Sequence, residues 1–201
     1  MKKGEQTRSL ILTEAVALAS HVGLEGLSIG SLASRLDLSK SGLFAHFGSK
    51  EDLQRLTIKE AWRLFKDQVF SRALKEPRGL PRLRALFSGW LASMAQNGDL
   101  SGGCLMLSAS AEYDDRPGAI RELLAAGQRE LRGAIVKTIR LAVEEGHLAA
   151  RTDPWQLSFE LFGIVLATHH DCRLLDDTRS VVRAQAAIER LIETHRSTSS
   201  G

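Results

Sequence analysis

The feature that most constrains the fold is a pair of short amphipathic segments within residues 27–47. Apolar residues recur at helical spacing over 29–36 and again over 40–47, as on helices that cover a core with one face. The segments are so close that the chain must turn sharply at Asp37. The pattern therefore predicts two short helices joined by a tight turn, the arrangement called a helix-turn-helix.

Residue types at the helix ends support this interpretation. Ser28 and Ser39 stand where a side-chain oxygen can accept a hydrogen bond from a free backbone N–H at a helix start. Asp37 stands in the turn, where φ is often positive, and Asp tolerates that conformation better than most residues. We expect Leu38 to insert from the turn into the core. Ser49, followed by Asp52, predicts another helix start directly afterwards.

The start of the second helix carries small polar and basic residues, Lys40, Ser41 and Gly42. That composition is typical of a recognition helix that enters the DNA major groove. The alternative is a plain helical hairpin in an all-α domain, with serines that serve only as caps. An amphipathic helix expected over 7–22 favours the first interpretation, because it completes a three-helix head.

Residues 7–60 resemble the DNA-binding domain of the TetR (tetracycline-repressor-like) family of bacterial transcriptional regulators. The matching residues are 11–19, 23–29, 32–33, 36, 38–44, 46–47 and 49–53. Beyond residue 60 the resemblance is one of architecture. It implies an all-helical domain that binds a ligand and forms a dimer.

The resemblance also implies DNA contacts. The residues concerned are Ser28, Ser39, Lys40, Ser41, Gly42, Phe44, His46 and Lys50. Lys40 and Ser41 would face base edges, Gly42 would allow close approach, and Lys50 would contact phosphate at a helix N-terminus. Many family members carry Tyr at the position of Phe44, which has no hydroxyl to bond phosphate.

The rest of the chain reads as helices separated by Gly and Pro. They are expected at 50–74, 83–96, 105–113, 119–145, 153–173 and 176–195, with loops at 97–98 and 101–103. No stretch alternates as a strand would, so the fold class is all-α. The expected organisation is a DNA-binding head at 1–48, a helical ligand-binding and dimerisation domain at 49–196, and a disordered tail at 197–201. The first few residues, with Lys2 and Lys3, are also expected to be disordered.

Composition excludes several classes. The chain has 201 residues and a formal net charge of +3, which is too small an excess for a non-specific nucleic-acid coat. No apolar run is long enough to span a membrane, and no signal peptide follows Met1. Cys104 and Cys172 are expected to be reduced thiols in the cytoplasm, with a redox-sensing pair as the less favoured alternative.

Two expected helices near the C-terminus carry apolar side chains suited to a subunit interface. The candidates are Trp155, Phe159, Phe162, Val181, Ala184, Ile188 and Leu191. The alternative is that both helices complete the core of a monomer. The resemblance favours a homodimer whose heads read half-sites about one helical turn or a multiple apart in double-stranded DNA.

A ligand site is expected among the middle helices, mostly apolar with a few polar anchors. The candidates are Trp62, Phe65, Phe87, Trp90, Met94, Met106, Tyr113, Phe162 and His169, with Glu112 as a further anchor. Residues of this kind are more often plain core than pocket. The ligand would be a small-molecule effector of unknown identity.

No catalytic signature is present, so an enzyme is not expected. The run 169–172 holds several metal-ligand types, but adjacent residues on a helix point in different directions, so neither a metal nor a cofactor is expected. The sequence thus predicts a dimeric, ligand-responsive transcriptional regulator, more in keeping with a repressor. The alternative is a small helical binding protein or enzyme with a vestigial head.

Overall fold

A computed structural model of the chain describes residues 3–95 and 104–197. The expected loops at 97–98 and 101–103, and the tail after Ser197, lie outside the described residues. The expectation of a disordered start is wrong from Lys3 onwards, because the first helix begins there. Outside the helices, the described residues contain an isolated antiparallel bridge between Leu148 and Arg196 but no strand.

The chain divides into two compact units. The first holds α1 (Lys3–Val22), α2 (Ile29–Leu36), α3 (Lys40–Phe47), α4 (Lys50–Phe65) as far as Leu64, α7 (Leu105–Glu112), and α8 (Ala119–Glu144) as far as Gly127. Its core is continuous from α1 through the short helices to α7 and α8. The predicted boundary after residue 48 was drawn from motifs, and it stays a prediction. By contacts, the head and α7 form one body.

Local side-chain bonds fix the two short helices, as the sequence predicts. Ser28 accepts a hydrogen bond from the Ser31 N–H at 3.0 Å, and Ser39 accepts one from the Gly42 N–H at 3.1 Å. Asp37 adopts the left-handed conformation with φ of 53°. The expectation for Leu38 is wrong: its side chain is 47% exposed, because the turn is closed by the backbone bond from Leu38 N–H to the Ala33 carbonyl.

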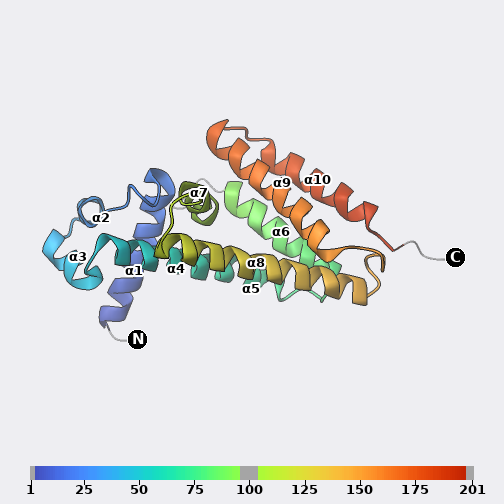
Figure 1. Cartoon of the computed structure of the whole chain (residues 1–201), viewed down its shortest axis with the longest axis horizontal. Coiled ribbons are helices and arrows are strands. Elements are labelled where there is room, and N and C mark those ends of the chain that lie inside the picture. Colours follow the sequence, from blue (N-terminus) through green and yellow to red (C-terminus); the bar gives the residue numbers. More distant parts are fainter. Residues whose placement is uncertain (1–2, 96–103, 198–201) are drawn as a thin grey trace. The chain divides into compact units, whose positions relative to one another are not determined.

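The second unit holds η1 (Lys66–Phe70), α5 (Ser71–Ala73), α6 (Leu80–Ala95), the remainder of α8, α9 (Pro154–Leu174) and α10 (Ser180–Thr194). Helices α9 and α10 lie side by side, and α6 packs against both (Figure 1). Asp153 caps α9 by accepting a bond from the Trp155 N–H, as predicted from the Asp-Pro signal.

Four helices differ from their predicted limits by more than one residue, and the first of them, α1, begins at Lys3 rather than at residue 7. The helix expected over 50–74 is interrupted by the π-helical segment η1, and α6 begins at Leu80, with Pro81 tolerated in its first turn. The last helix begins at Ser180 rather than 176, because Asp176 takes a positive φ of 50°. No helix among the described residues is long and apolar enough to cross a membrane.

The π-helical segment has a packing consequence within the second unit. Its hydrogen bonds join residues five apart, so Phe65 and Phe70 lie on one side of the helix with ring centroids 5.7 Å apart. Phe65 in turn contacts Trp90 edge-on at 5.1 Å. The segment therefore directs two rings toward the same interior.

Gly127 of α8 is a close-packed position whose substitution tests the first unit's core. A Cβ at Gly127 would overlap the Trp62 indole, whereas one at Gly133 of the same helix would meet nothing within 4 Å. We expect Gly127→Ala to lower the free energy of unfolding by about 1–3 kcal/mol through overpacking. Gly133→Ala should raise it by roughly 0.5–1 kcal/mol through helix propensity. Urea denaturation of both variants measures this, and a stabilised Gly127→Ala would contradict the packing.

Candidate nucleic-acid interface

The face of α3 opposite the core carries the predicted DNA contacts. Leu43 and Phe47 are buried and anchor the helix. The predicted contacts Ser39, Lys40, Ser41, Gly42, Phe44 and His46 are all exposed. Phe44 is 57% exposed although it is a large apolar side chain, so burial in this unit does not account for it. The recognition helix thus presents small, basic and aromatic groups on one surface.

Lys40 lies against the start of α2. A Cβ added to Gly30 would be 3.7 Å from the Lys40 Nζ and 3.8 Å from the Ser28 Oγ. The first N–H groups of a helix have no acceptor within that helix and carry partial positive charge. The ammonium of Lys40 therefore adds to the positive potential at the N-terminus of α2.

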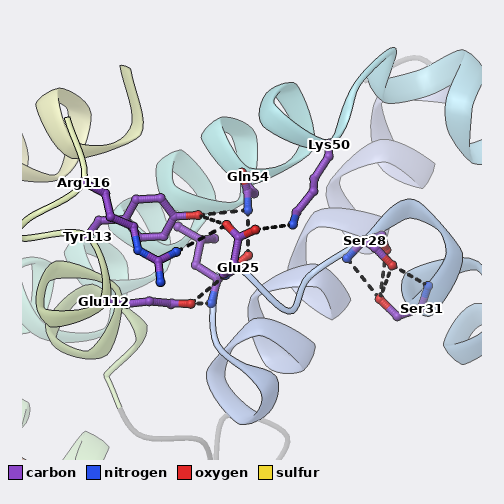
Figure 2. A network of polar contacts seen from close by, with 9 residues as sticks. Glu25, Ser28, Ser31, Lys50, Gln54, Glu112, Tyr113 and Arg116 are labelled. Carbon is purple, nitrogen blue, oxygen red and sulfur yellow. Dashed lines mark hydrogen bonds and ion pairs between the residues drawn. The ribbon is translucent and has the colours of Figure 1, made fainter. Parts of the chain in front are cut away.

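Lys50, at the start of α4, is held in an ion pair. Its Nζ lies 2.7 Å from the Glu25 Oε1, and both side chains are about half exposed (Figure 2). Ser49 caps this helix by accepting a bond from the Asp52 N–H at 3.0 Å. Lys50 is thus positioned at a helix N-terminus, with its charge matched by a carboxylate rather than free.

Glu25 is itself held by groups from α4 and the end of α7. Its Oε2 accepts a hydrogen bond from the Tyr113 hydroxyl at 2.7 Å and lies 3.8 Å from the Arg116 Nη1. Gln54 Nε2 donates to the Tyr113 oxygen at 3.1 Å. The bonds from Lys50 and Tyr113 lower the pKa of Glu25 from 4.5 to about 2. Burial, and then the neighbouring Glu25, raises the pKa of Tyr113 above its usual range.

Glu112 completes the network by holding the backbone (Figure 2). Its two carboxylate oxygens accept hydrogen bonds from the Leu24 and Glu25 N–H groups at 2.8 and 2.9 Å. Tyr113 and Glu112, predicted as ligand anchors, are therefore engaged with the loop between α1 and α2. Sequence reasoning missed Glu25, Gln54 and Arg116, since their partners lie far away along the chain and no local pattern marks them.

The predicted ligand residues separate between the units. Trp62, Met106 and Tyr113 belong to the first. The second contains Phe65, Phe87, Trp90, Met94, Phe162 and His169. Of these, the structure brings four rings together: Trp90 contacts Phe65, Phe87 and Phe162 at centroid distances of 5.1, 6.2 and 5.8 Å.

Two pockets found among the described residues each have one predicted ligand residue in their lining. One, of about 340 Å³, is beside the network and is lined by Lys50, Tyr113 and Arg116 among others. The other, of about 360 Å³, lies along α6 and α10 and is lined by Phe87, Arg84 and others.

The predicted interface residues fall into two groups. Trp155 and Phe159 of α9 are 58% and 65% exposed, whereas Phe162, Ala184 and Ile188 are at most 5% exposed. Those three side chains pack inside their own subunit and have little surface left for a partner. The stripe predicted on α10, with Val181 and Leu191 at its edges, thus points mainly into the second unit. The exposed apolar surface also includes Leu166 and Val182.

The run 169–172 does not gather into a metal site. Among residues 3–95 and 104–197, no three His, Cys, Asp or Glu side chains are placed to hold one ion. Cys104 and Cys172 are not joined by a disulfide. Burial raises the pKa of the Cys172 thiol and lowers that of His169.

The depressed pKa of Glu25 makes a testable contribution to stability. A carboxyl whose pKa is lower in the folded state stabilises the fold above its unfolded pKa, and the contribution disappears as pH falls toward the folded value. We expect Glu25→Gln to lower the free energy of unfolding at pH 7 by less than about 1 kcal/mol, because the side chain is half exposed. The difference from the unmodified protein should shrink between about pH 4.5 and pH 2.

Denaturant titrations over that pH range measure the effect. Asp115→Asn, at an exposed position in the turn after α7, serves as the control and should show no such trend. A Glu25→Gln difference that is constant with pH would contradict the ion pair.

Comparisons with known proteins agree with this architecture. The N-terminal model of the bacterial regulatory proteins of the tetR family matches residues 11–55, and the tetracyclin repressor-like C-terminal domain matches residues 79–188. No curated protein matches the sequence at a significant level.

Solved structures share the fold at low identity. A TetR transcriptional regulator from Chloroflexus aurantiacus is 22% identical with a TM-score of 0.87, and 98% of each chain is covered. A TetR-family regulator from Cytophaga hutchinsonii is 19% identical with a TM-score of 0.83, covering 99% of each chain. A transcriptional regulator from Saccharomonospora viridis, solved with choline, is 19% identical with a TM-score of 0.77, covering 94% of this chain and 96% of that one.

The C-terminal model alone spans more than half of the chain, and the N-terminal model covers the helix-turn-helix built from α2 and α3. The chain therefore belongs to the TetR family of DNA-binding transcriptional regulators.

Proposed function

We propose that this regulator binds a near-palindromic operator as a homodimer in the cytoplasm, represses transcription, and leaves DNA when a small molecule binds. The observation that carries the proposal is the exposed face of α3, which presents Lys40, Ser41, Gly42 and Phe44. Capping interactions in the turns before and after α3 fix the position of this helix. DNA binding is assigned to residues 1–48, and effector binding and dimerisation to residues 49–196.

The roles within the head follow from position and charge. Lys40 and Ser41 read base edges, because they lead the recognition helix. The uncapped N–H groups near Ser28, together with Lys50, bind phosphate. Phe44 packs against the sugar-phosphate backbone, and His46 lies beside it. Lys50 reaches phosphate only by exchanging its Glu25 partner, so the ion pair lowers the net gain from that contact.

Dimerisation is supported by the exposed apolar side chains of α9. Trp155, Phe159 and Leu166 recur at helical spacing along one side of the helix, and all three are at least 45% exposed. Apolar surface of this kind, gathered in one stripe, is typical of a protein interface. A two-fold dimer also explains how one small head reaches operator specificity.

The effector is assigned to the second unit because aromatic rings gather there around Trp90. The similar regulator from Saccharomonospora viridis was solved with choline. That likeness supports a small-molecule site in this fold without naming the molecule bound here.

The first experiment is selection of bound duplexes from a random DNA pool at about physiological salt with non-specific competitor. Recovery of a near-palindromic site supports the proposal and supplies the operator. Loss of occupancy on addition of a small molecule then supports release. A protein that selects no sequence, with or without candidate effectors, would overturn the proposal and favour a head that no longer reads DNA.

Lys40 and Lys50 should show different signatures on the selected operator. We expect Lys50→Ala to weaken binding to all duplexes and reduce the salt slope by about one, because one phosphate contact is lost. Lys40→Ala should relax preference at one base position, at a cost of about 1–3 kcal/mol. Fluorescence anisotropy over a salt series, with operator and scrambled duplexes, separates the two. Identical behaviour of the two variants would show that the roles are assigned wrongly.

Phe159 tests the dimer. A charge at this 65% exposed position would be buried in the proposed interface, so Phe159→Asp should weaken dimerisation about thirtyfold or more, as for a hot-spot residue. Leu74→Asp, at a 60% exposed position in the second unit, should leave the association unchanged. Sedimentation equilibrium measures both. A Phe159→Asp protein that dimerises normally would move the interface away from this stripe.

A further inference from the structure

Arg132 of α8 has an unusual environment in the second unit. Its guanidinium lies 3.6 Å from the centroid of the Phe162 ring. The side chain is partly buried, and this burial lowers the pKa of Arg132. Over residues 3–95 and 104–197, no carboxylate forms an ion pair with it. A partly buried cation that stacks on a ring but lacks a carboxylate is costly unless an anion reaches it.

Buried polar groups without a hydrogen-bond partner occur in the described parts of α6 and α9, the two helices that carry Trp90 and Phe162. Trp90, whose ring centroid is 5.8 Å from that of Phe162, is 1% exposed, and its Nε1 has no partner in the described part of the chain. Ser158 lies one turn before Phe162 on α9, is also 1% exposed, and its hydroxyl has no partner there either. The Nε2 of His169, two turns after Phe162 on α9, also has no hydrogen-bond partner in the described part of the chain.

These unpaired groups share one chemical character. The guanidinium and the indole N–H can only donate, and the serine hydroxyl can donate as well. Buried polar groups are almost always hydrogen-bonded, so an orphaned set indicates a missing partner. The partner that satisfies donors beside a cation is an acceptor with negative charge.

We propose that the effector is an organic anion, a carboxylate whose negative group binds Arg132 beside the aromatic cluster of Trp90 and Phe162. The inference rests on the proposed function, since it names the class of molecule that the effector site takes. The bidentate geometry of a guanidinium suits a carboxylate, and the buried rings of Trp90 and Phe162 make the surroundings of Arg132 apolar.

A cationic effector fits this environment less well. Aromatic faces attract quaternary ammonium groups, as in sites for choline. Here Arg132 already occupies the face of Phe162, so a second cation would meet like charge at short range. The positive charge of Arg132 therefore favours an anion over a cation such as the choline found with the similar regulator from Saccharomonospora viridis.

Melting of the full-length protein tests the inference with matched probes. Benzoate and hexanoate are compared with benzamide and hexanamide, which keep the apolar body and remove the charge, and with choline chloride, at constant ionic strength. We expect at least one carboxylate to raise the melting temperature through binding to the folded state, and its amide to have little effect. No shift with either carboxylate, an equal shift with the amides, or a shift with choline alone would overturn the proposal.

Variants of α8 assign any binding to the guanidinium. Arg132→Gln should weaken carboxylate binding by roughly tenfold to a hundredfold in calorimetry. Arg132→Lys should retain a weaker preference for the anion, and Arg129→Gln, exposed on the same helix, should bind normally. Without ligand, Arg132→Gln should melt close to the unmodified protein, because the lost stack on Phe162 is offset by removal of a partly buried charge that has no carboxylate partner; a structural role would instead lower the melting temperature. Unchanged carboxylate binding in Arg132→Gln would contradict the site.

DNA binding is measured separately. Carboxylate binding that depends on Arg132 but leaves the operator complex intact would support the anion site and contradict ligand-responsive repression. Sequence-specific DNA binding without any carboxylate response would contradict the anion site and leave the DNA-binding function standing.

Discussion

The carboxylate of Glu25 is the polar contact that joins the loop between α1 and α2 to both α4 and the end of α7. One of its oxygens holds Lys50 at the start of α4, and the other accepts a hydrogen bond from Tyr113 at the end of α7. Such a shared acceptor couples elements that are far apart in sequence, because moving either donor changes the position of the other. Glu112 reinforces the arrangement by binding the backbone on which Glu25 stands. Within the first unit, the helix-turn-helix and α7 therefore behave as parts of one hydrogen-bonded body.

The interior of the second unit is stabilised by a different kind of contact. Its interior is organised by aromatic edges around Trp90 rather than by shared carboxylates. An aromatic interior holds its shape through packing, but it leaves buried N–H and O–H groups without acceptors, as at Trp90 and Ser158. Among the described residues, the first unit joins Glu25, Gln54 and Glu112 in one bonded network, whereas the second leaves the Trp90 Nε1 and the Ser158 hydroxyl without partners. Ligand sites are mostly apolar with a few polar groups, so these two groups suit a bound molecule.

Sequence reasoning succeeded where the determining contact is local. Ser28, Asp37, Ser39 and Asp153 act within a few residues of themselves, so their spacing predicts the cap or turn that the structure contains. Leu38 was placed wrongly because exposure depends on how helices pack, which hydrophobicity alone does not reveal.

The other features that sequence reasoning missed also depend on how distant parts of the chain pack together. The spacing of apolar residues predicted a stripe on α10, but Ala184 and Ile188 of that stripe are buried in the core of their own chain. Such spacing shows that a helix has an apolar face, but it does not show which element packs on that face. The Glu25 network joins residues separated by 25 positions (Lys50 and Glu25) to 91 positions (Arg116 and Glu25), and no short pattern records such pairs.

The π-helical segment Lys66–Phe70 has a consequence for changes in chain length. Residues five apart on a π-helix lie on nearly the same side of the helix, as residues four apart do on an α-helix. Loss of one residue between Phe65 and Phe70 would therefore convert the segment to an ordinary helix while keeping the two rings adjacent. The same deletion inside α6 between Phe87 and Trp90 would turn one ring away from the other. Among the described helices, loss of a single residue is thus best tolerated in Lys66–Phe70, where the helix already carries an extra residue.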